Sequence, residues 1–375
     1  MSPSYTSCRG LDVLFVSYGG GHITAVLPLA NAMQAKGYKV GVFALTTATG
    51  VMAAQNVVPW FGYSQLPQFD GHAQALGQRY QTEVEENPLM SLQESIAYMG
   101  LNMQQLIADH GEEGAKQRLQ TEGRRAFLPV ALCKQILADL APRLLMSTNS
   151  PRTEQATFLA ARALGIPSVA LIDQFGALDV QRMSQAGYGD VVCVLNDWVK
   201  DRLIALGRPA QDVVVTGNPA FDFLWDPQLL AHGKQLRQNL APGHRTVILW
   251  ASQNEPPPGP ANMPVLVEQA LRSYVASRQD TALLVRYHPS QKMEFVPQAH
   301  VFLSPSSDQL EAVLHACDVV VTRNSTVGLQ GALVGKGLIA ANFGNPRKGI
   351  RFEEVGLCRA VDNAHELANE IQRLT

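Results

Sequence analysis

The chain has few of the features that mark a metal-binding, disulfide-linked or membrane-spanning protein. Its five cysteines stand singly, with no C-x-x-C pair and no close cluster with histidine, so neither a zinc site nor a disulfide framework is indicated. No D-x-D pair lies in a suitable loop, and we therefore expect no metal and no cofactor. No segment approaches the run of about 18 apolar residues that a membrane span requires.

The chain also lacks a strong net charge. A formal net charge of −2 provides no bulk attraction to nucleic acid or to an anionic membrane. We expect no nucleic-acid partner, while peripheral membrane contact stays open. The first ten residues are polar and lack the basic start and apolar stretch of a signal peptide, so we expect a cytoplasmic location.

Length and composition favour two globular domains. The chain has 375 residues, of which 46% are hydrophobic and 17% charged, and a single core stops growing at roughly 250–300 residues. Pro219, Pro227 and Pro242 surround a short helical segment that precedes a new series of apolar runs. This pattern predicts an N-terminal domain over 1–222 and a C-terminal domain over 223–375.

Short apolar runs alternate with amphipathic stretches in both halves. The chain opens with a run at 13–16, a glycine turn, a helical stretch at 23–35 and a second run at 39–44, which is the pattern of a βαβ unit. Similar alternation follows from residue 144 onward and again from residue 246. The segment at about 70–140 is polar with helical periodicity. The sequence thus predicts an α/β fold with two Rossmann-like domains and a helical insertion in the first.

A glycine cluster follows the first apolar run. Gly20 and Gly21 lie in the strand-to-helix turn Ser17-Tyr18-Gly19-Gly20-Gly21-His22, where a ligand can approach closely and helix amides can face an anion. The glycines are contiguous, unlike those of G-x-G-x-x-G, which argues against NAD. His22 is a candidate base for an acceptor hydroxyl. The alternative is a histidine that caps the helix or only contacts substrate.

Polar residues begin a helix in the second half. Ser325 and Thr326 follow a strand that ends at Thr322, and two hydroxyls with free amides suit a diphosphate. Asn324 precedes them, and Gln330 lies one turn further along, where it can reach a ribose or base. An ordinary N-cap explains one of the two hydroxyl residues, but phosphate binding is the preferred interpretation.

Two other strands of the second half end in polar residues. His288 ends one strand and should face the carboxyl edge, where open α/β sheets bind ligands. Ser252 and Gln253 follow the first strand of that half and share this edge. The alternatives are a structural histidine and a polar turn. The isolated carboxylates of the first half give a metal site little support; they are Asp173, Asp190 and Asp222.

These motifs together resemble the GT-B superfamily of glycosyltransferases. The Gly-Gly-Gly-His turn resembles the acceptor-side loop of the peptidoglycan N-acetylglucosaminyltransferase and of plant-type UDP-sugar transferases. Thr216-Gly217-Asn218-Pro219 and the segment 322–330, with Gly335-Lys336 after it, resemble GT-B elements and those of non-hydrolysing UDP-N-acetylglucosamine 2-epimerases. The His288-Pro289 pair resembles a motif of bacterial sialyl-, Kdo- and glycerophosphate-type transferases, which use CMP- or CDP-activated donors.

The resemblance implies two domains facing across a cleft, the first binding the acceptor and the second the nucleotide-sugar donor. It implies His22 as the base, Asn218 as a cleft residue, and Ser325 and Thr326 as contacts of the donor phosphates. Many such enzymes carry Glu where this chain has Gln330, which forms hydrogen bonds but bears no charge.

We therefore expect a metal-independent glycosyltransferase that moves a hexosyl or N-acetylhexosaminyl group to a hydroxyl of a glycan, lipid-linked or small-molecule acceptor. A UDP-sugar is the favoured donor and a CMP-sugar the alternative. Two other functions stay open: a non-hydrolysing nucleotide-sugar 2-epimerase, and a catalytically silent nucleotide-sugar-binding partner protein.

Overall fold

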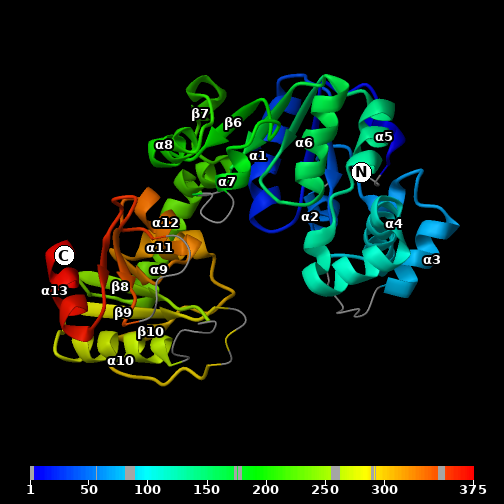
Figure 1. Ribbon diagram of the computed structural model, residues 1–375. Coiled ribbons are helices and arrows are strands. Elements are labelled where there is room, and N and C mark those ends of the chain that lie inside the picture. The colour runs from blue at the N-terminus through cyan, green and yellow to red at the C-terminus, as the bar shows by residue number, and fades with distance from the viewer. Residues whose placement is uncertain are drawn as a thin grey trace. The chain divides into compact units, whose positions relative to one another are not determined.

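The chain folds into two compact units, Met1–Ala220 (unit 1) and Phe221–Thr375 (unit 2) (Figure 1). The computed structural model describes residues 4–55, 57–80, 89–172, 175, 180–254, 262–288, 291, 293–344 and 351–375. The boundary expected at residue 222 lies two residues beyond this division. Asp173 and Pro289, singled out in the sequence, lie outside the described residues.

Unit 1 is built on a seven-stranded sheet in which every strand pair is parallel. The strand order is β3-β2-β1-β4-β5-β6-β7. The strands are β1 (Val13–Ser17), β2 (Val40–Ala44), β3 (Trp60–Phe61), β4 (Leu144–Ser147), β5 (Ser168–Leu171), β6 (Val191–Val194) and β7 (Val213–Val215). The winding direction reverses between β1 and β4. In doubly wound sheets, the crevice at the carboxyl ends of two such strands is the usual place for a ligand.

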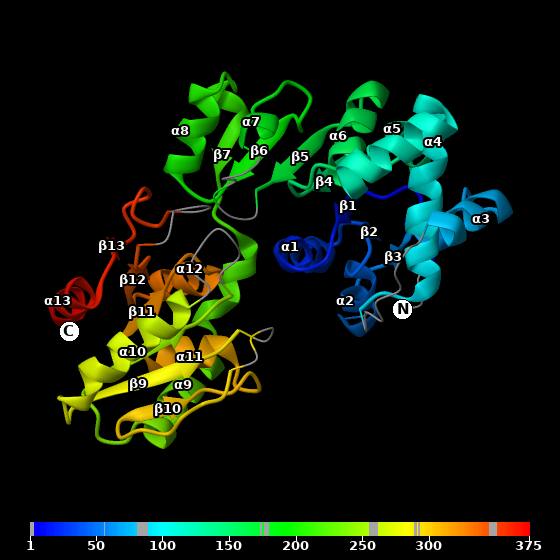
Figure 2. The same ribbon diagram turned by 60° about the horizontal axis from the view of Figure 1, so that its bottom comes forward.

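Helices cover both faces of this sheet. Helix α1 (Gly21–Ala35) and α2 (Ala48–Gln55) pack on one face, and α5 (Val130–Leu140) and α6 (Thr153–Leu164) lie on the other (Figure 2). All five residues of β1 and all five of β2 are buried. Strands that are buried on both faces read as continuous apolar runs, which is why their positions could be predicted from the sequence.

A helical segment lies between β3 and β4. It comprises α3 (Gly71–Tyr80), α4 (Leu92–Glu122), η3 (Gly123–Ala126) and α5. Helix α4 is interrupted at Gly111, whose φ of 72° is in the left-handed region. Ser91 caps this helix by accepting a hydrogen bond from the amide of Glu94. These helices occupy the stretch for which the sequence predicts a helical insertion.

Unit 2 repeats the plan with six parallel strands in the order β10-β9-β8-β11-β12-β13. The strands are β8 (Thr246–Ala251), β9 (Thr281–Arg286), β10 (Val301–Leu303), β11 (Val319–Thr322), β12 (Gly337–Ala341) and β13 (Arg359–Val361). The helices are α9 (Pro227–Leu240), α10 (Met263–Ala276), α11 (Leu310–Ala316), α12 (Thr326–Leu333) and α13 (Ala364–Leu374). The winding reverses between β8 and β11, so unit 2 has its own switch point.

The remaining elements are short, and several elements of the structure were not predicted. Unit 1 also contains η1 (Thr6–Cys8), η2 (Tyr63–Gln65), α7 (Val180–Met183), α8 (Asp197–Ala205) and η4 (Ala210–Asp212), and η5 (Pro219–Trp225) joins the units. Strands β3 and β13 and helices α2, α7 and α13 were not predicted. Strand β3 has two residues and β13 three, which is too short for a periodic pattern.

Candidate functional site

The glycine turn of unit 1 brings the start of α1 to the carboxyl end of β1. A Cβ atom at Gly19 would overlap with the hydroxyl of Thr47, so the turn packs directly on the segment after β2. Gly20 has φ 67° and ψ −136°, a conformation that side chains with a Cβ rarely adopt. Gly21 then begins a helix of fifteen residues. The turn therefore requires its glycines and sets His22 in the first turn of α1.

His22 is paired with a buried glutamate from the helix that follows β4, the strand across the switch point. Nδ1 of His22 lies 3.4 Å from Oε2 of Glu154, in the first turn of α6, and contacts the hydroxyl of Thr148, which follows β4. That hydroxyl donates its only proton to Glu154, at 2.7 Å, so its oxygen accepts from Nδ1–H of His22. The neutral imidazole then carries its lone pair on Nε2. This is the arrangement of a general base oriented by a carboxylate.

Glu154 is held as a carboxylate although it is fully buried. It accepts hydrogen bonds from the amide of Tyr18 at 2.8 Å and the amide of Ser150 at 2.6 Å, in addition to the Thr148 hydroxyl. Burial acts to raise the pKa of Glu154, but the charge that His22 carries when protonated, the hydrogen bond of His22 and the two backbone amides outweigh it and hold the pKa below its usual value. The negative charge opposite Nδ1 of His22 is thus maintained at neutral pH.

An arginine that the sequence analysis did not single out lies beside this pair. The guanidinium of Arg152 stacks over the ring of Tyr18, 4.4 Å from its centroid, and donates to the hydroxyl of Tyr98 at 3.2 Å. The hydroxyl of Tyr18 is also hydrogen-bonded to Thr153 at 3.0 Å. A cation is therefore fixed at the N-terminus of α6, next to the glycine turn.

Asn218 is not part of this cluster. It follows β7, four strand spacings from β1 in the sheet, or roughly 19 Å at about 4.8 Å per spacing. The residue is 8% exposed, and its side-chain oxygen accepts a hydrogen bond from the amide of Ala220 at 2.9 Å. Within unit 1 this contact stabilises the turn that leads out of the sheet, so the structure does not bring Asn218 to His22.

In unit 2, the residues predicted after three different strands meet at the switch point. The side-chain amide of Gln253, after β8, donates to Oδ1 of Asn324, after β11, at 2.8 Å. Gln291, which was not predicted, connects this pair to the end of β9. Its side-chain amide donates to the backbone carbonyl of Gln253 at 3.0 Å, and its Oε1 accepts from the backbone amide of His288 at 2.8 Å. One hydrogen-bonded edge therefore holds Gln253, His288 and Asn324. Ser252, directly after β8, is buried and only 6% exposed.

Helix α12 starts at the same edge. Ser325 is its N-cap, and its hydroxyl accepts a hydrogen bond from the amide of Val327 at 3.3 Å. This is the ordinary helix cap that the sequence left open as an alternative to phosphate binding. Thr326 is exposed at the first helical position, and Gln330 is half-buried one turn later. A Cβ at Gly328 would lie 2.9 Å from Phe352 and from Thr322, so this glycine allows α12 to pack close to the sheet.

Other polar residues of the sequence analysis have structural roles or lie elsewhere. Asp190 precedes β6 and accepts hydrogen bonds from the amide and hydroxyl of Ser168, at 2.7 and 2.9 Å, at the opposite edge of the sheet. Arg323, not predicted, is 8% exposed directly after β11. Within the described ranges, no three His, Cys, Asp or Glu side chains gather in a way that could hold a metal ion. Among the same residues, no helix is long and apolar enough to cross a membrane.

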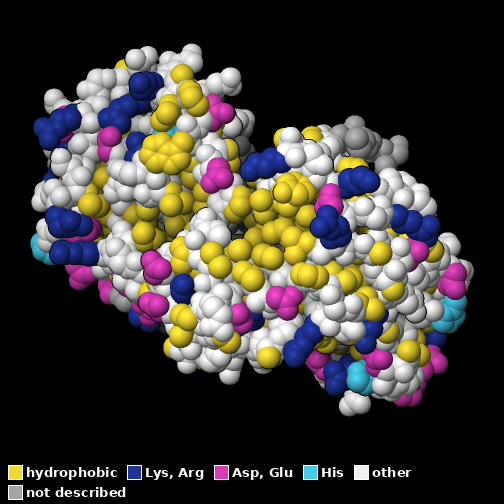
Figure 3. All heavy atoms as spheres, turned by 90° about the horizontal axis from the view of Figure 1, so that it is seen from above, with side chains coloured by type: hydrophobic (Ala, Val, Ile, Leu, Met, Phe, Trp, Pro, Cys, Tyr) yellow, Lys and Arg dark blue, Asp and Glu magenta, His cyan; other side chains and the backbone are white. Residues whose placement is uncertain are grey.

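The surface carries mixed charge on the face seen in Figure 3. Lys and Arg side chains are interspersed there with Asp and Glu, and hydrophobic side chains are also visible on this face. This distribution accords with the near-zero net charge of the chain.

The sequence matches no family model and no curated protein. The structure is similar to the UDP-GlcNAc 2-epimerase from Neisseria meningitidis bound to UDP-GlcNAc, with 12% identity over 96% of this chain and 90% of that chain and a TM-score of 0.60. It is also similar to the UDP-GlcNAc 2-epimerase from Methanocaldococcus jannaschii (11% identity, 96% and 91% covered, TM-score 0.59) and to the glycotransferase of kitacinnamycin (15%, 96% and 90%, TM-score 0.56).

Similarity at these identities shows the fold. The chain has an α/β fold of the GT-B class, with two Rossmann-like units and one parallel sheet in each. The fold expected from the sequence is thereby confirmed.

Proposed function

We propose that the protein is a metal-independent glycosyltransferase that uses a nucleotide-sugar donor. The observation that carries the proposal is the pairing of His22 with buried Glu154 at the switch point of unit 1, since this pairing suits the removal of a proton from a hydroxyl. An enzyme that transfers a sugar by direct attack of an acceptor hydroxyl uses such a base, and the general fold class hosts this chemistry. Fold alone would not assign it.

In the proposed reaction, the oxygen of an acceptor hydroxyl attacks the anomeric carbon of the donor sugar. Nε2 of His22 takes the hydroxyl proton, and Glu154 stabilises the imidazolium that forms. The bond from the anomeric carbon to the diphosphate oxygen breaks, and the nucleoside diphosphate leaves with the electron pair. The dipole of α12, together with Thr326 and His288, would stabilise the leaving group in unit 2.

The chemistry of the unit 2 edge supports an anionic ligand there. The residues after β8, β9 and β11 include amides, hydroxyls, His288 and Arg323, and neither Asp nor Glu stands among the described residues 252–254, 286–288 and 322–326. A diphosphate placed at this edge meets no carboxylate from these segments. UDP is the favoured nucleotide, because the Neisseria meningitidis protein of the same fold binds UDP-GlcNAc.

The second candidate is a nucleotide-sugar 2-epimerase, which two of the three similar structures named above favour. Epimerisation needs acid and base groups near the sugar. At the unit 1 switch point, the carboxylate within the described ranges is Glu154, and its oxygens already serve two amides, a hydroxyl and His22. The geometry therefore supports transfer to a hydroxyl better than epimerisation.

The test combines donor binding with turnover. A thermal-shift screen of UDP-, CMP-, CDP-, GDP- and TDP-linked sugars identifies the donor, because a ligand of the folded state raises its stability. Gln253→Ala should abolish the shift, while Gln238→Ala, at an exposed position of α9, should keep it. His22→Ala should bind the donor normally and lose turnover by about 10²–10⁴-fold, unlike His72→Ala, an exposed histidine of α3.

Three results would contradict the proposal. A new sugar isomer formed without any acceptor would show the epimerase. Tight donor binding with no hydrolysis, transfer or epimerisation across an acceptor panel would show a silent binding protein. Full turnover in His22→Ala would remove the proposed base.

A further inference from the structure

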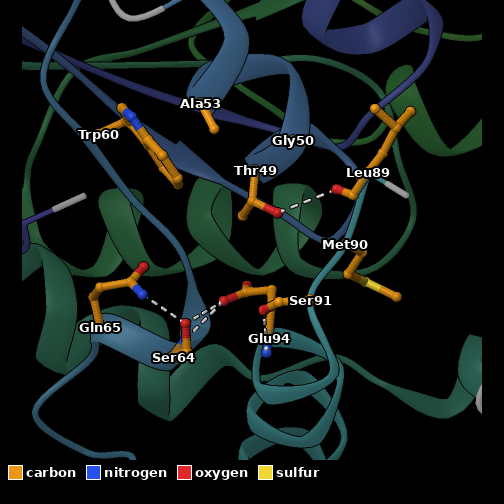
Figure 4. Close-up of a pocket in the computed structure, with 10 residues that line it drawn as sticks. All are labelled: Thr49, Gly50, Ala53, Trp60, Ser64, Gln65, Leu89, Met90, Ser91 and Glu94. Carbon is orange, nitrogen blue, oxygen red and sulfur yellow. Dashed lines mark hydrogen bonds between the residues drawn. The ribbon is translucent and has the colours of Figure 1, made fainter. Parts of the chain in front are cut away.

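Unit 1 contains a cavity of about 230 Å³ that the proposed reaction does not yet use. Its walls come from the first turns of α2, from Trp60 of β3, from η2 and from the segment that leads into α4 (Figure 4). Helix α4 belongs to the helical segment between β3 and β4, so the cavity lies where that segment meets the sheet.

The cavity opens beside the same sheet edge as His22. Its walls include Thr49 and Ser64, which follow the carboxyl ends of β2 and β3, and these strands are the first and second neighbours of β1 on that side. Two strand spacings amount to about 10 Å. The glycine turn also packs on Thr47 and Ala48, directly before Thr49. The cavity and His22 therefore lie near the same carboxyl edge of the sheet, about two strand spacings apart.

One end of the cavity is formed by a buried carboxylate. Glu94, 2% exposed, accepts hydrogen bonds from the amides of Tyr63 and Ser64, at 2.8 and 2.9 Å, and from the Ser64 hydroxyl at 2.7 Å. A carboxylate has about four acceptor positions, so one remains for a ligand donor. Burial raises the pKa of Glu94, against these hydrogen bonds. A hydroxyl or ammonium group in the cavity would complete its hydrogen bonding.

The other end is apolar. Figure 4 shows the ring of Trp60 and the methyl group of Ala53 on the side away from Glu94, with Leu89 and Met90 on a further wall. An apolar cavity of about 150 Å³ accommodates benzene. The volume here therefore suits one six-membered ring with a polar substituent, whose body would contact the Trp60 side and whose donor would face Glu94.

We propose that this cavity binds the terminal ring of the acceptor, an apolar six-membered ring that bears a hydroxyl or amino group. The ring substituent donates a hydrogen bond to Glu94, and the hydroxyl that receives the sugar lies about 10 Å away, at His22. The identification of the ligand as the acceptor rests on the proposed function, whereas the binding of such a ring does not.

The test measures ring binding directly, without any donor. Benzyl alcohol, benzylamine and toluene are titrated by ligand-observed NMR, and the first two should bind with a Kd of about 1–10 mM, as expected for ligands of so few atoms. Toluene, which has no hydrogen-bond donor, should bind at least threefold more weakly. Ala53→Leu fills the cavity from an exposed helical position and should abolish binding, while Ala54→Leu on the same helix should not.

The outcomes separate this inference from the proposed function. No binding by the wild-type protein, or equal binding by Ala53→Leu and the wild type, would overturn the ring site whatever the reaction is. If a transfer reaction is measured, benzyl alcohol should raise the KM for the acceptor and leave that for the donor unchanged. An unchanged acceptor KM would overturn the acceptor assignment. His22→Ala should bind benzyl alcohol as the wild type does, so a failed base leaves the cavity result intact.

Discussion

Replacement of Glu154 by glutamine tests the buried pair on which the proposed chemistry depends. The side chain keeps its size but loses its charge and one acceptor oxygen. Oε1 serves the amide of Tyr18, and Oε2 serves the amide of Ser150 and the hydroxyl of Thr148. In either orientation, the new NH₂ group faces an N–H donor that loses its partner inside the protein.

The expected loss of stability follows from these contacts. One buried N–H without an acceptor costs about 1–3 kcal/mol, and the lost attraction between the carboxylate and His22 adds to it, for a total of about 2–4 kcal/mol. For a unit of this size the midpoint should fall by about 5–15 °C. Turnover should fall with it, since Nδ1 of His22 is no longer opposite a negative charge.

The pH dependence gives an independent readout. The native pKa of Glu154 lies below that of an unfolded glutamate, about 4.3. The carboxylate therefore stabilises unit 1 above that pH, and this contribution disappears as the pH falls through the lower native pKa. Glu154→Gln should remove this part of the acid-induced loss. Glu113→Gln, an exposed change of the same charge on α4, should alter stability by less than about 0.5 kcal/mol.

Hydrogen exchange read by mass spectrometry is the assay, because it reports on each unit separately. Peptides from β1, β4 and α6 should lose protection in Glu154→Gln, and peptides from β8 and β9 should not. A variant as stable as the wild type, or one that loses protection equally in both units, would falsify the account of this pair.

Three further changes probe other parts of the structure. Gly328→Ala places a Cβ 2.9 Å from two neighbouring side chains and should destabilise unit 2 by about 1–3 kcal/mol in urea unfolding. As a control, Gly71→Ala should not destabilise unit 1, because a Cβ at Gly71 meets no atom within 4 Å. Arg208 is 4% exposed and donates to five backbone carbonyls between residues 183 and 190. Arg208→Lys should therefore lower the free energy of unfolding by about 2 kcal/mol. The control is Arg118→Lys, on the exposed face of α4. Asn324→Asp keeps the oxygen that accepts the hydrogen bond from Gln253 but adds a negative charge. Calorimetry should show at least about tenfold weaker UDP binding by this variant. Equal UDP affinity of the variant and the wild type would contradict the donor site.

Most strands of both sheets could be predicted, because a strand that is buried on both faces has an uninterrupted run of apolar residues in the sequence. The segment 319–322 and the segment 337–341 read as apolar runs, and the structure has β11 and β12 at these residues. Strand β3 has no such run, because it consists only of Trp60 and Phe61, which pair with β2. Helix α2 was missed because its eight residues, Ala48–Gln55, have little amphipathic contrast.

The pairing within the candidate site depends on strand order, which no local pattern contains. His22 could be chosen because the glycine turn beside it is visible in the sequence. Glu154 was not singled out in the sequence, because its role depends on β4 lying next to β1 across more than a hundred residues. Asn218 was chosen from a motif, and the same strand order places it at the far side of the sheet.

The two switch points share a geometry but differ in charge, and this difference supports the roles that we propose for them. In unit 1, the strands on either side of the reversal bring a histidine and a buried carboxylate together, which suits a proton and not a phosphate. In unit 2, the equivalent strands bring together Gln253 and Asn324, two neutral amides, beside the start of α12. In the proposed reaction, the dipole of α12 stabilises a diphosphate in the second environment, whereas the first holds the carboxylate of Glu154 opposite His22. The same fold used twice therefore provides, in the proposed reaction, a base in one unit and a leaving-group site in the other.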